Sequence, residues 1–249
     1  MLAARNPALG VFRPSHGQAR SGSDLSGARS SRFANPNIYL RTEIAFNSLY
    51  ALQNVVIGRV LGSPADRQVV ASGGGGFLLV LDQDSGQKLA TSPNLGTGGG
   101  ALSLFDLDGD GVQEILVAPA YEPMLSTGVA ATSTLSVLRY SASTSSLQVI
   151  AQAPLGELTT DISGKAARRV TAMTGSGAGA PKRIVVTTLG GELIAFEWNA
   201  AASSLTRKWS GFVEGGLGAF HSLHLGNLTG ASTDELYLAS TMGIKKFHF

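Results

Sequence analysis

Two segments of this chain, residues 104–118 and 225–239, align with one another without a gap. Residues 58–71 fit the same pattern with one residue inserted, and residues 173–187 fit it as well. Each segment is an apolar stretch, a polar glycine-rich loop and a second apolar stretch. The equivalent positions Gln68, Glu114, Arg183 and Glu235 are 46, 69 and 52 residues apart. Self-similarity at this spacing predicts an array of similar supersecondary units.

Further strands are expected in each unit. A third apolar stretch follows the loop in all four units, and a weaker fourth stretch follows in three of them. The third strands are expected at residues 77–81, 135–140, 193–198 and 244–249, and the fourth at residues 88–91, 147–151 and 205–209. No segment has a sustained 3.6-residue apolar period, so little helix is expected. Four-stranded antiparallel units at this spacing predict an all-β fold, a β-propeller with about four blades, either small or part of a larger ring. The repeats span about 49–95, 100–156, 166–215 and 219–249.

The N-terminal region differs from the rest. Residues 1–35 are rich in Arg and Ser, and they are expected to form a disordered tail, with an organellar transit peptide as the alternative. Residues 38–46 alternate in polarity as a strand does, and the strand count suggests that this segment completes the last blade. A cytoplasmic location is favoured, and organellar import stays open.

Charge and composition exclude several classes of function. Residues 1–41 hold six Arg and one acid, Asp24, which leaves 13 basic and 16 acidic residues and a net charge of −3 for the remainder. A nucleic-acid partner is therefore not expected. The chain has no Cys, so disulfides and Cys-ligated zinc are excluded. No apolar run reaches the about 18 residues of a membrane span.

One loop carries a pattern with clear chemistry, DLDGDGVQE at residues 106–114. Acids at alternate positions converge when a loop curls around a cation, and the glycines at 109 and 111 permit the positive φ of such a curl. The expected calcium ligands are Asp106, Asp108, Asp110, the Val112 carbonyl and Glu114. An EF-hand is rejected because its twelfth position is Val117 and its flanks are strands; a solvated acidic turn is the alternative. The loop beginning at Asn227 is a weaker candidate.

The loop and its flanks, residues 105–118, resemble the FG-GAP repeat of integrin α-subunit propellers and the related bacterial VCBS repeats. Both carry D-x-D-x-D-G-x-x-[DE] between strands, and the resemblance extends as a repeat pattern over about residues 48–249. It implies a calcium-ligand role for the loop residues named above. Residues 118–120 and 71–73 stand where the tripeptide GAP would be, which points to the wider superfamily rather than to integrins. Similar repeats build intracellular scaffold propellers.

No catalytic constellation is visible in the sequence. His221 and His224 would face opposite sides of a strand, and the glycine-rich segments are followed by strands rather than by the helix that phosphate loops need. The expected function is therefore that of a non-enzymatic, calcium-binding scaffold for protein partners, as part of a larger complex or alone. Two alternatives stay open: a propeller enzyme of the quinone-dependent dehydrogenase or lyase type, and a bacterial surface adhesion module.

Overall fold

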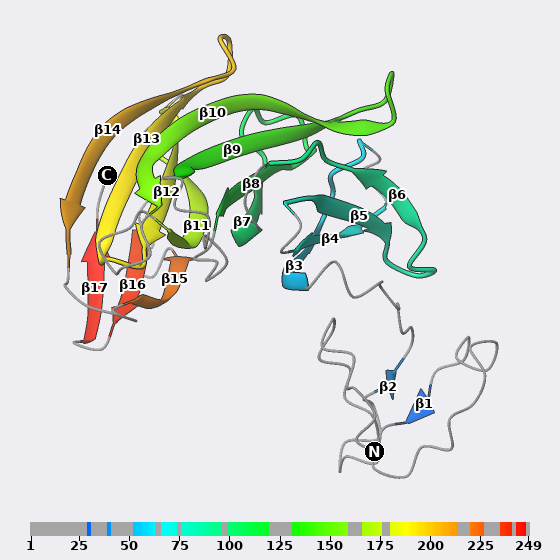
Figure 1. The fold of residues 1–249 in the computed structure, drawn as a ribbon, viewed down its shortest axis with the longest axis horizontal. Coiled ribbons are helices and arrows are strands. Elements are labelled where there is room, and N and C mark those ends of the chain that lie inside the picture. Colours follow the sequence, from blue (N-terminus) through cyan, green and yellow to red (C-terminus); the bar gives the residue numbers. More distant parts are fainter. Residues whose placement is uncertain are drawn as a thin grey trace.

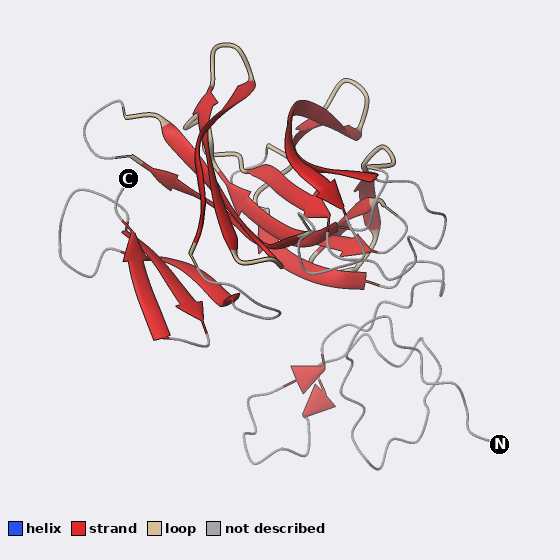
Figure 2. Cartoon of the chain, turned by 60° about the vertical axis from the view of Figure 1, so that its left-hand side comes forward, coloured by secondary structure: helices blue, strands red, loops and turns tan. Residues whose placement is uncertain are grey.

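The computed structural model is all-β (Figure 1). It describes residues 29–30, 39–40, 52–62, 66–73, 76–95, 99–119, 131–158, 166–175, 180–213, 220–226, 235–240 and 243–247. Within these residues every regular element is a strand (Figure 2), and none is a helix that could cross a membrane. The expected all-β fold with propeller-like antiparallel sheets is thereby confirmed.

Four antiparallel sheets follow one another along the chain. The first has the order β3 (Leu52–Gly58), β4 (Gln68–Gly73), β5 (Leu78–Asp82) and β6 (Lys88–Thr91). The second comprises β7 (Gly99–Phe105), β8 (Glu114–Pro119), β9 (Ala131–Ser141) and β10 (Ser146–Leu158). The third comprises β11 (Ala167–Thr174), β12 (Lys182–Thr188), β13 (Glu192–Asn199) and β14 (Ser204–Phe212). The fourth has three strands, β15 (Phe220–Gly226), β16 (Glu235–Ser240) and β17 (Gly243–Phe247).

The sheets are arranged as an open arc (Figure 1). Their first strands are neighbours, with β3 against β7, β7 against β11 and β11 against β15. Their fourth strands also meet, β6 with β10 and β10 with β14. Among the described strands, no comparable contact joins the fourth sheet to the first. The described sheets therefore stack as propeller blades do, without closing into a ring.

The core lies between successive sheets. In β8, Ile115 and Val117 pack in a cluster with the first sheet, whereas Leu116 and Ala118 pack in a cluster with the third. All four side chains are buried. Because alternate residues of a strand point to opposite faces, a strand between two sheets needs apolar residues at every position, which the run from Ile115 to Ala118 supplies. Burial of each large aliphatic side chain contributes about 1.5–3 kcal/mol.

The N-terminal region is described only at four residues. β1 (Arg29–Ser30) and β2 (Tyr39–Leu40) pair with each other in a separate two-stranded sheet. The expected disordered tail, except Arg29 and Ser30, lies outside the described residues, as does the expected strand 38–46 except Tyr39 and Leu40. In the part that is described, β17 has no neighbour on its outer side, so the expected pairing of residues 38–46 with the last sheet is not observed there.

Candidate metal centre

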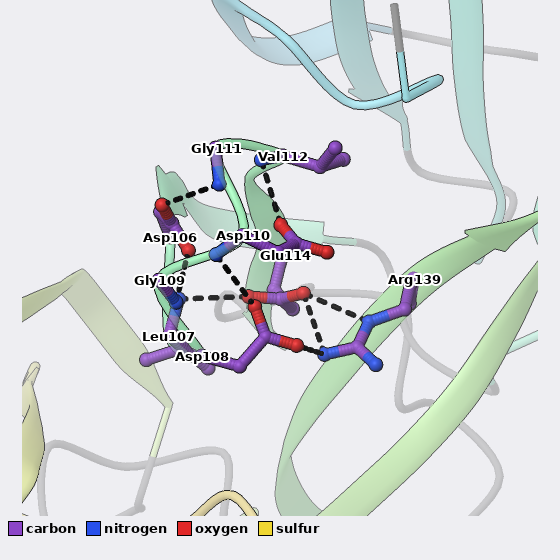
Figure 3. Close-up of polar contacts among 9 residues, drawn as sticks. All are labelled: Asp106, Leu107, Asp108, Gly109, Asp110, Gly111, Val112, Glu114 and Arg139. Atoms are coloured by element: carbon purple, nitrogen blue, oxygen red, sulfur yellow. Dashed lines mark hydrogen bonds and ion pairs between the residues drawn. The ribbon is translucent and has the colours of Figure 1, made fainter.

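The acidic loop connects β7 to β8 in the second sheet (Figure 3). Gly109 and Gly111 have φ values of 84° and 88°, in the left-handed region that side chains disfavour. A Cβ at either position would meet no atom within 4 Å. The backbone conformation, rather than lack of space, therefore accounts for both glycines, as the sequence predicted.

Backbone amides of the loop donate to its acidic side chains. Asp106 accepts from Gly109 N at 2.6 Å on Oδ1 and from Gly111 N at 2.9 Å on Oδ2. Asp110 Oδ1 accepts from Val112 N at 2.8 Å, and Asp108 Oδ1 accepts a long bond of 3.4 Å from Asp110 N. These bonds hold the loop in its curled conformation.

Three of the four predicted acidic ligands converge. Asp106, Asp108 and Glu114 each place one carboxylate oxygen within 4.8 Å of the others. Asp110 does not belong to this group, and its carboxylate faces the amide of Val112 (Figure 3). The cluster combines an intermediate, an exposed and a buried residue, so it extends from the surface to the base of the loop.

Glu114 closes the base of the loop. Its side chain is buried, and Oε2 accepts a hydrogen bond of 2.8 Å from Leu107 N. Burial raises the pKa of Glu114 above its ordinary value, because the Leu107 amide and the nearby guanidinium of Arg139 only partly offset the loss of hydration.

Arg139, in β9, is a site residue that the loop pattern does not reveal. Its Nε lies 2.8 Å from Glu114 Oε1, and its Nη2 lies 2.8 Å from the same oxygen and 2.5 Å from Asp108 Oδ2. Burial opposes the charge of Arg139, but the carboxylates of Glu114 and Asp108 outweigh it and raise the pKa of the guanidinium. A fixed positive charge therefore already contacts two of the three converging acids.

Strand pairing brings Arg139 to this place. β8 and β9 pair with Ile115 opposite Leu138 and Leu116 opposite Val137. Continuing that register by one residue puts Arg139 beside Glu114, on the same face of the sheet. The contact depends on the register between β8 and β9, which are separated in the sequence by residues 120–130.

In the first sheet, the position equivalent to Glu114 is occupied by Gln68, which has no charge. Gln68 is buried, and its Oε1 accepts from Val60 N at 2.9 Å and from Leu61 N at 3.3 Å, while its Nε2 donates to Asp66 O. Gln68 and Glu114 thus both accept hydrogen bonds from the start of their own loop. The shared role of the position is to satisfy buried backbone amides, and only Glu114 adds a charge to it.

The equivalent positions in the other two sheets differ. Arg183 in β12 is basic and lies opposite Glu197 of β13. Glu235 in β16 is buried and contacts Tyr237 and Lys246. The weaker candidate ligands Asn227, Thr229 and Ala231 lie outside the described residues.

The acidic loop is also tied to the preceding sheet. Gln113 N donates to Arg59 O at 2.7 Å, and Arg59 N donates back to Gln113 Oε1 at 3.0 Å. Gly58 makes this close approach possible, since a Cβ there would overlap the Gln113 amide oxygen and lie 2.5 Å from Leu104 Cδ1. The loop is therefore held both by Arg139 of its own sheet and by Arg59, which follows β3 of the first sheet.

No protein-family model matches this sequence, and no curated protein is similar to it. Among solved structures, Sqt1 of Saccharomyces cerevisiae is 17% identical, with a TM-score of 0.53 over 80% of this chain and 47% of that chain. A chain of a mitotic checkpoint complex is 10% identical, with a TM-score of 0.48 over 73% of this chain and 45% of that chain. The computationally designed Ika4 protein is 14% identical, with a TM-score of 0.43 over 80% of this chain and 91% of that chain.

The likeness to Sqt1 supports the β-propeller fold and nothing finer. The match spans about half the length of that protein. The narrower likeness to FG-GAP and VCBS repeats rests on the acidic loop and on the repeat pattern of the sequence, and no family model supports it.

Proposed function

We propose that this chain is a non-enzymatic β-propeller module for protein partners whose second sheet binds Ca²⁺ in the loop at residues 106–114. The observation that carries the calcium proposal is the convergence of Asp106, Asp108 and Glu114 within 4.8 Å. The interaction role is supported by the propeller-type stack of sheets, a rigid frame that presents its loops and outer strands to solvent.

The spacing of the acids fits the ion. Calcium binds oxygen at about 2.3–2.6 Å, so two ligands on opposite sides of it lie at most about 4.6–5.2 Å apart. The oxygens of Asp106, Asp108 and Glu114 satisfy that limit. Asp110 and the Val112 carbonyl are the further ligands that the sequence predicts. Bound calcium would supply the positive charge that offsets repulsion among the carboxylates.

Arg139 is the competitor for the same oxygens. It contacts Asp108 and Glu114, and its side chain is 35% exposed, so it can turn into solvent when an ion enters. Calcium binding must then exceed the free energy of the lost ion pairs, which lowers the affinity below that of a loop without such an arginine. The loop is therefore expected to bind calcium weakly and to keep its shape without it.

Titration calorimetry on chelator-treated protein tests the calcium proposal. We expect saturable binding of one ion, and an increase of about 2.7 kcal/mol in the free energy of unfolding when free calcium is 100 times Kd. Asp108→Asn should weaken binding at least about tenfold, which corresponds to 1.4 kcal/mol. Asp84→Asn, an exposed acid in the β5–β6 turn, is the matched control and should leave it unchanged. Wild-type protein that shows neither heat nor a shift in Tm with calcium would refute the proposal.

A further inference from the structure

The two halves of the acidic loop are anchored to different neighbouring sheets. Leu107, between the first two predicted ligands, is 2% exposed and belongs to the apolar cluster that the second sheet shares with the third. Gln113, between the last two predicted ligands, is hydrogen-bonded to Arg59, which follows β3 of the first sheet. An ion that binds the whole loop therefore takes ligands from one half fixed against the third sheet and from another half fixed against the first.

Arg59 holds both the backbone and the side chain of Gln113. Gln113 N donates to Arg59 O at 2.7 Å, and Gln113 Oε1 accepts from Arg59 N at 3.0 Å. Gln113 N shares a planar trans peptide group with the Val112 carbonyl, so the bond to Arg59 makes that carbonyl point away from Arg59. The contact thus orients one predicted ligand directly, and it fixes the residue that precedes a second predicted ligand, Glu114.

The contact depends on Gly58, the residue before Arg59. A Cβ at Gly58 would overlap Gln113 Oε1 and lie 2.5 Å from Leu104 Cδ1. The φ of Gly58 lies outside the left-handed region, so alanine there would meet crowding but no backbone strain. Gly58 is therefore a place in the first sheet where a small change can displace Gln113 without altering any residue of the loop.

We propose that the first sheet sets the calcium affinity of the loop through Gln113, which acts as a positioning residue. This inference rests on the proposed calcium function and adds its regulation. An ion binds more tightly to ligands that are already held in place, because less conformational freedom is lost on binding. Coupling between two equilibria is reciprocal, so bound calcium strengthens the contact between Arg59 and Gln113 by the same factor. The ion then stabilises the junction between two sheets as well as the loop.

Titration calorimetry of two variants tests whether this junction controls the ion. Gly58→Ala crowds Gln113 from the first sheet, and Gln113→Met removes the acceptor for Arg59 N while keeping the length of the side chain. Neither variant removes a predicted calcium ligand. Each should weaken calcium binding about fivefold or more. Either variant decides the outcome if the other does not fold.

Two variants of the same kind are the matched controls. Gly211→Ala crowds Trp209 in the third sheet, where a Cβ would lie 2.8 Å from Trp209 Cζ2, and Gln148→Met replaces an exposed glutamine of β10. Both should bind calcium as the wild type does, even where they lower the Tm. A loss of affinity in Gly211→Ala as large as that in Gly58→Ala overturns the inference, because general loosening of the protein would then account for both.

Hydrogen exchange of the wild type measures the reciprocal effect. Calcium should slow exchange of the Arg59 and Gln113 amides about fivefold or more beyond its effect on the Val213 amide, which donates to Gly191 O at the third sheet. A purely structural contact would not respond to the ion, so equal slowing of all three amides overturns the inference. Unchanged calcium affinity in either folded variant, Gly58→Ala or Gln113→Met, also overturns it and leaves the calcium proposal standing. A wild type that binds no calcium overturns both.

Discussion

The guanidinium of Arg139 lies against the buried carboxylate of Glu114, with 2.8 Å between Nε and Oε1. The two residues come from neighbouring strands, and the contact supplies the acidic loop with a positive charge of its own. In the metal-free protein, the charge of Glu114 is therefore compensated by a side chain. This relationship determines how the loop should respond to mutation, pH and calcium.

Arg139→Gln should have opposite effects on stability and on calcium binding. Without the guanidinium, Glu114 keeps a buried charge with one fewer partner, so the metal-free protein should lose about 1–3 kcal/mol of unfolding free energy. The positive charge that competes with the ion is lost as well. Calcium should therefore bind at least about ten times more tightly, which corresponds to 1.4 kcal/mol or more of binding free energy. Urea denaturation with chelator and titration calorimetry measure the two effects.

Arg207→Gln is the matched control for this prediction. Arg207 forms an ion pair with Glu192 in the third sheet, away from the loop, so calcium affinity should not change. An Arg139→Gln protein whose calcium affinity equals that of the wild type would show that the guanidinium does not compete with the ion.

Replacing Glu114 should reveal the cost of its buried charge. Glu114→Gln keeps an acceptor for Leu107 N, as Gln68 does in the first sheet, and should cost less than about 1 kcal/mol at neutral pH. Glu114→Ala leaves that amide without its acceptor and should cost about 1–3 kcal/mol more. Equal stability of the two variants would contradict the backbone role of this position.

The pH dependence of the same pair has a defined sign. Because the folded protein raises the pKa of Glu114 above its ordinary value of 4.5, the folded state binds the proton more tightly than the unfolded state does. The stabilising contribution is complete below pH 4.5 and is lost as the pH rises through the raised value. With chelator present, the unfolding free energy of the wild type minus that of Glu114→Gln should therefore fall between pH 4.5 and 7. A difference that rises over this range would contradict the direction of the shift.

Part of the candidate site is visible in the sequence because its geometry is local. Gly109 and Gly111 adopt the positive φ that the loop pattern requires, and three of the four acids converge. Arg139 could not be predicted because its place depends on the register between β8 and β9, and the loop pattern contains no information about that register. Asp110 was expected among the converging acids, but its carboxylate accepts a hydrogen bond from the nearby amide of Val112 instead.

The fold was predictable where strands are buried on both faces, because such strands are continuous apolar runs. The prediction failed at the end of β10, which was expected to stop at Ala151 and continues to Leu158. Its last part alternates buried Ala153 and Leu155 with exposed Gln152 and Pro154, and the small side chains of Ala151 and Ala153 at buried positions weaken the apolar signal.

Gly58→Ala should destabilise the contact between the first and second sheets. The added methyl group overlaps the Gln113 side chain and crowds Leu104, so the variant should lose about 1–3 kcal/mol. Combining it with Gln113→Ala removes one of the two clashes, and the double variant should lose at least about 0.5 kcal/mol less than the sum of the single effects. Leu89→Ala combined with Gly58→Ala, by contrast, should be additive. Additivity in both double variants would show that Gly58 and Gln113 are not in contact.

The packing of the second sheet between two others can be tested by comparing neighbouring residues in β8. Ile115 faces the first sheet and Leu116 faces the third, and both are buried. A sheet with one covered face would tolerate alanine at one of these positions, whereas a propeller blade should tolerate it at neither. We expect Ile115→Ala and Leu116→Ala each to cost about 2–5 kcal/mol in urea denaturation, because each leaves a cavity in a different cluster. Leu89→Ala, at a leucine that is 38% exposed, should cost less than about 1 kcal/mol. If Ile115→Ala or Leu116→Ala is as mild as Leu89→Ala, that face of the blade is not packed as described.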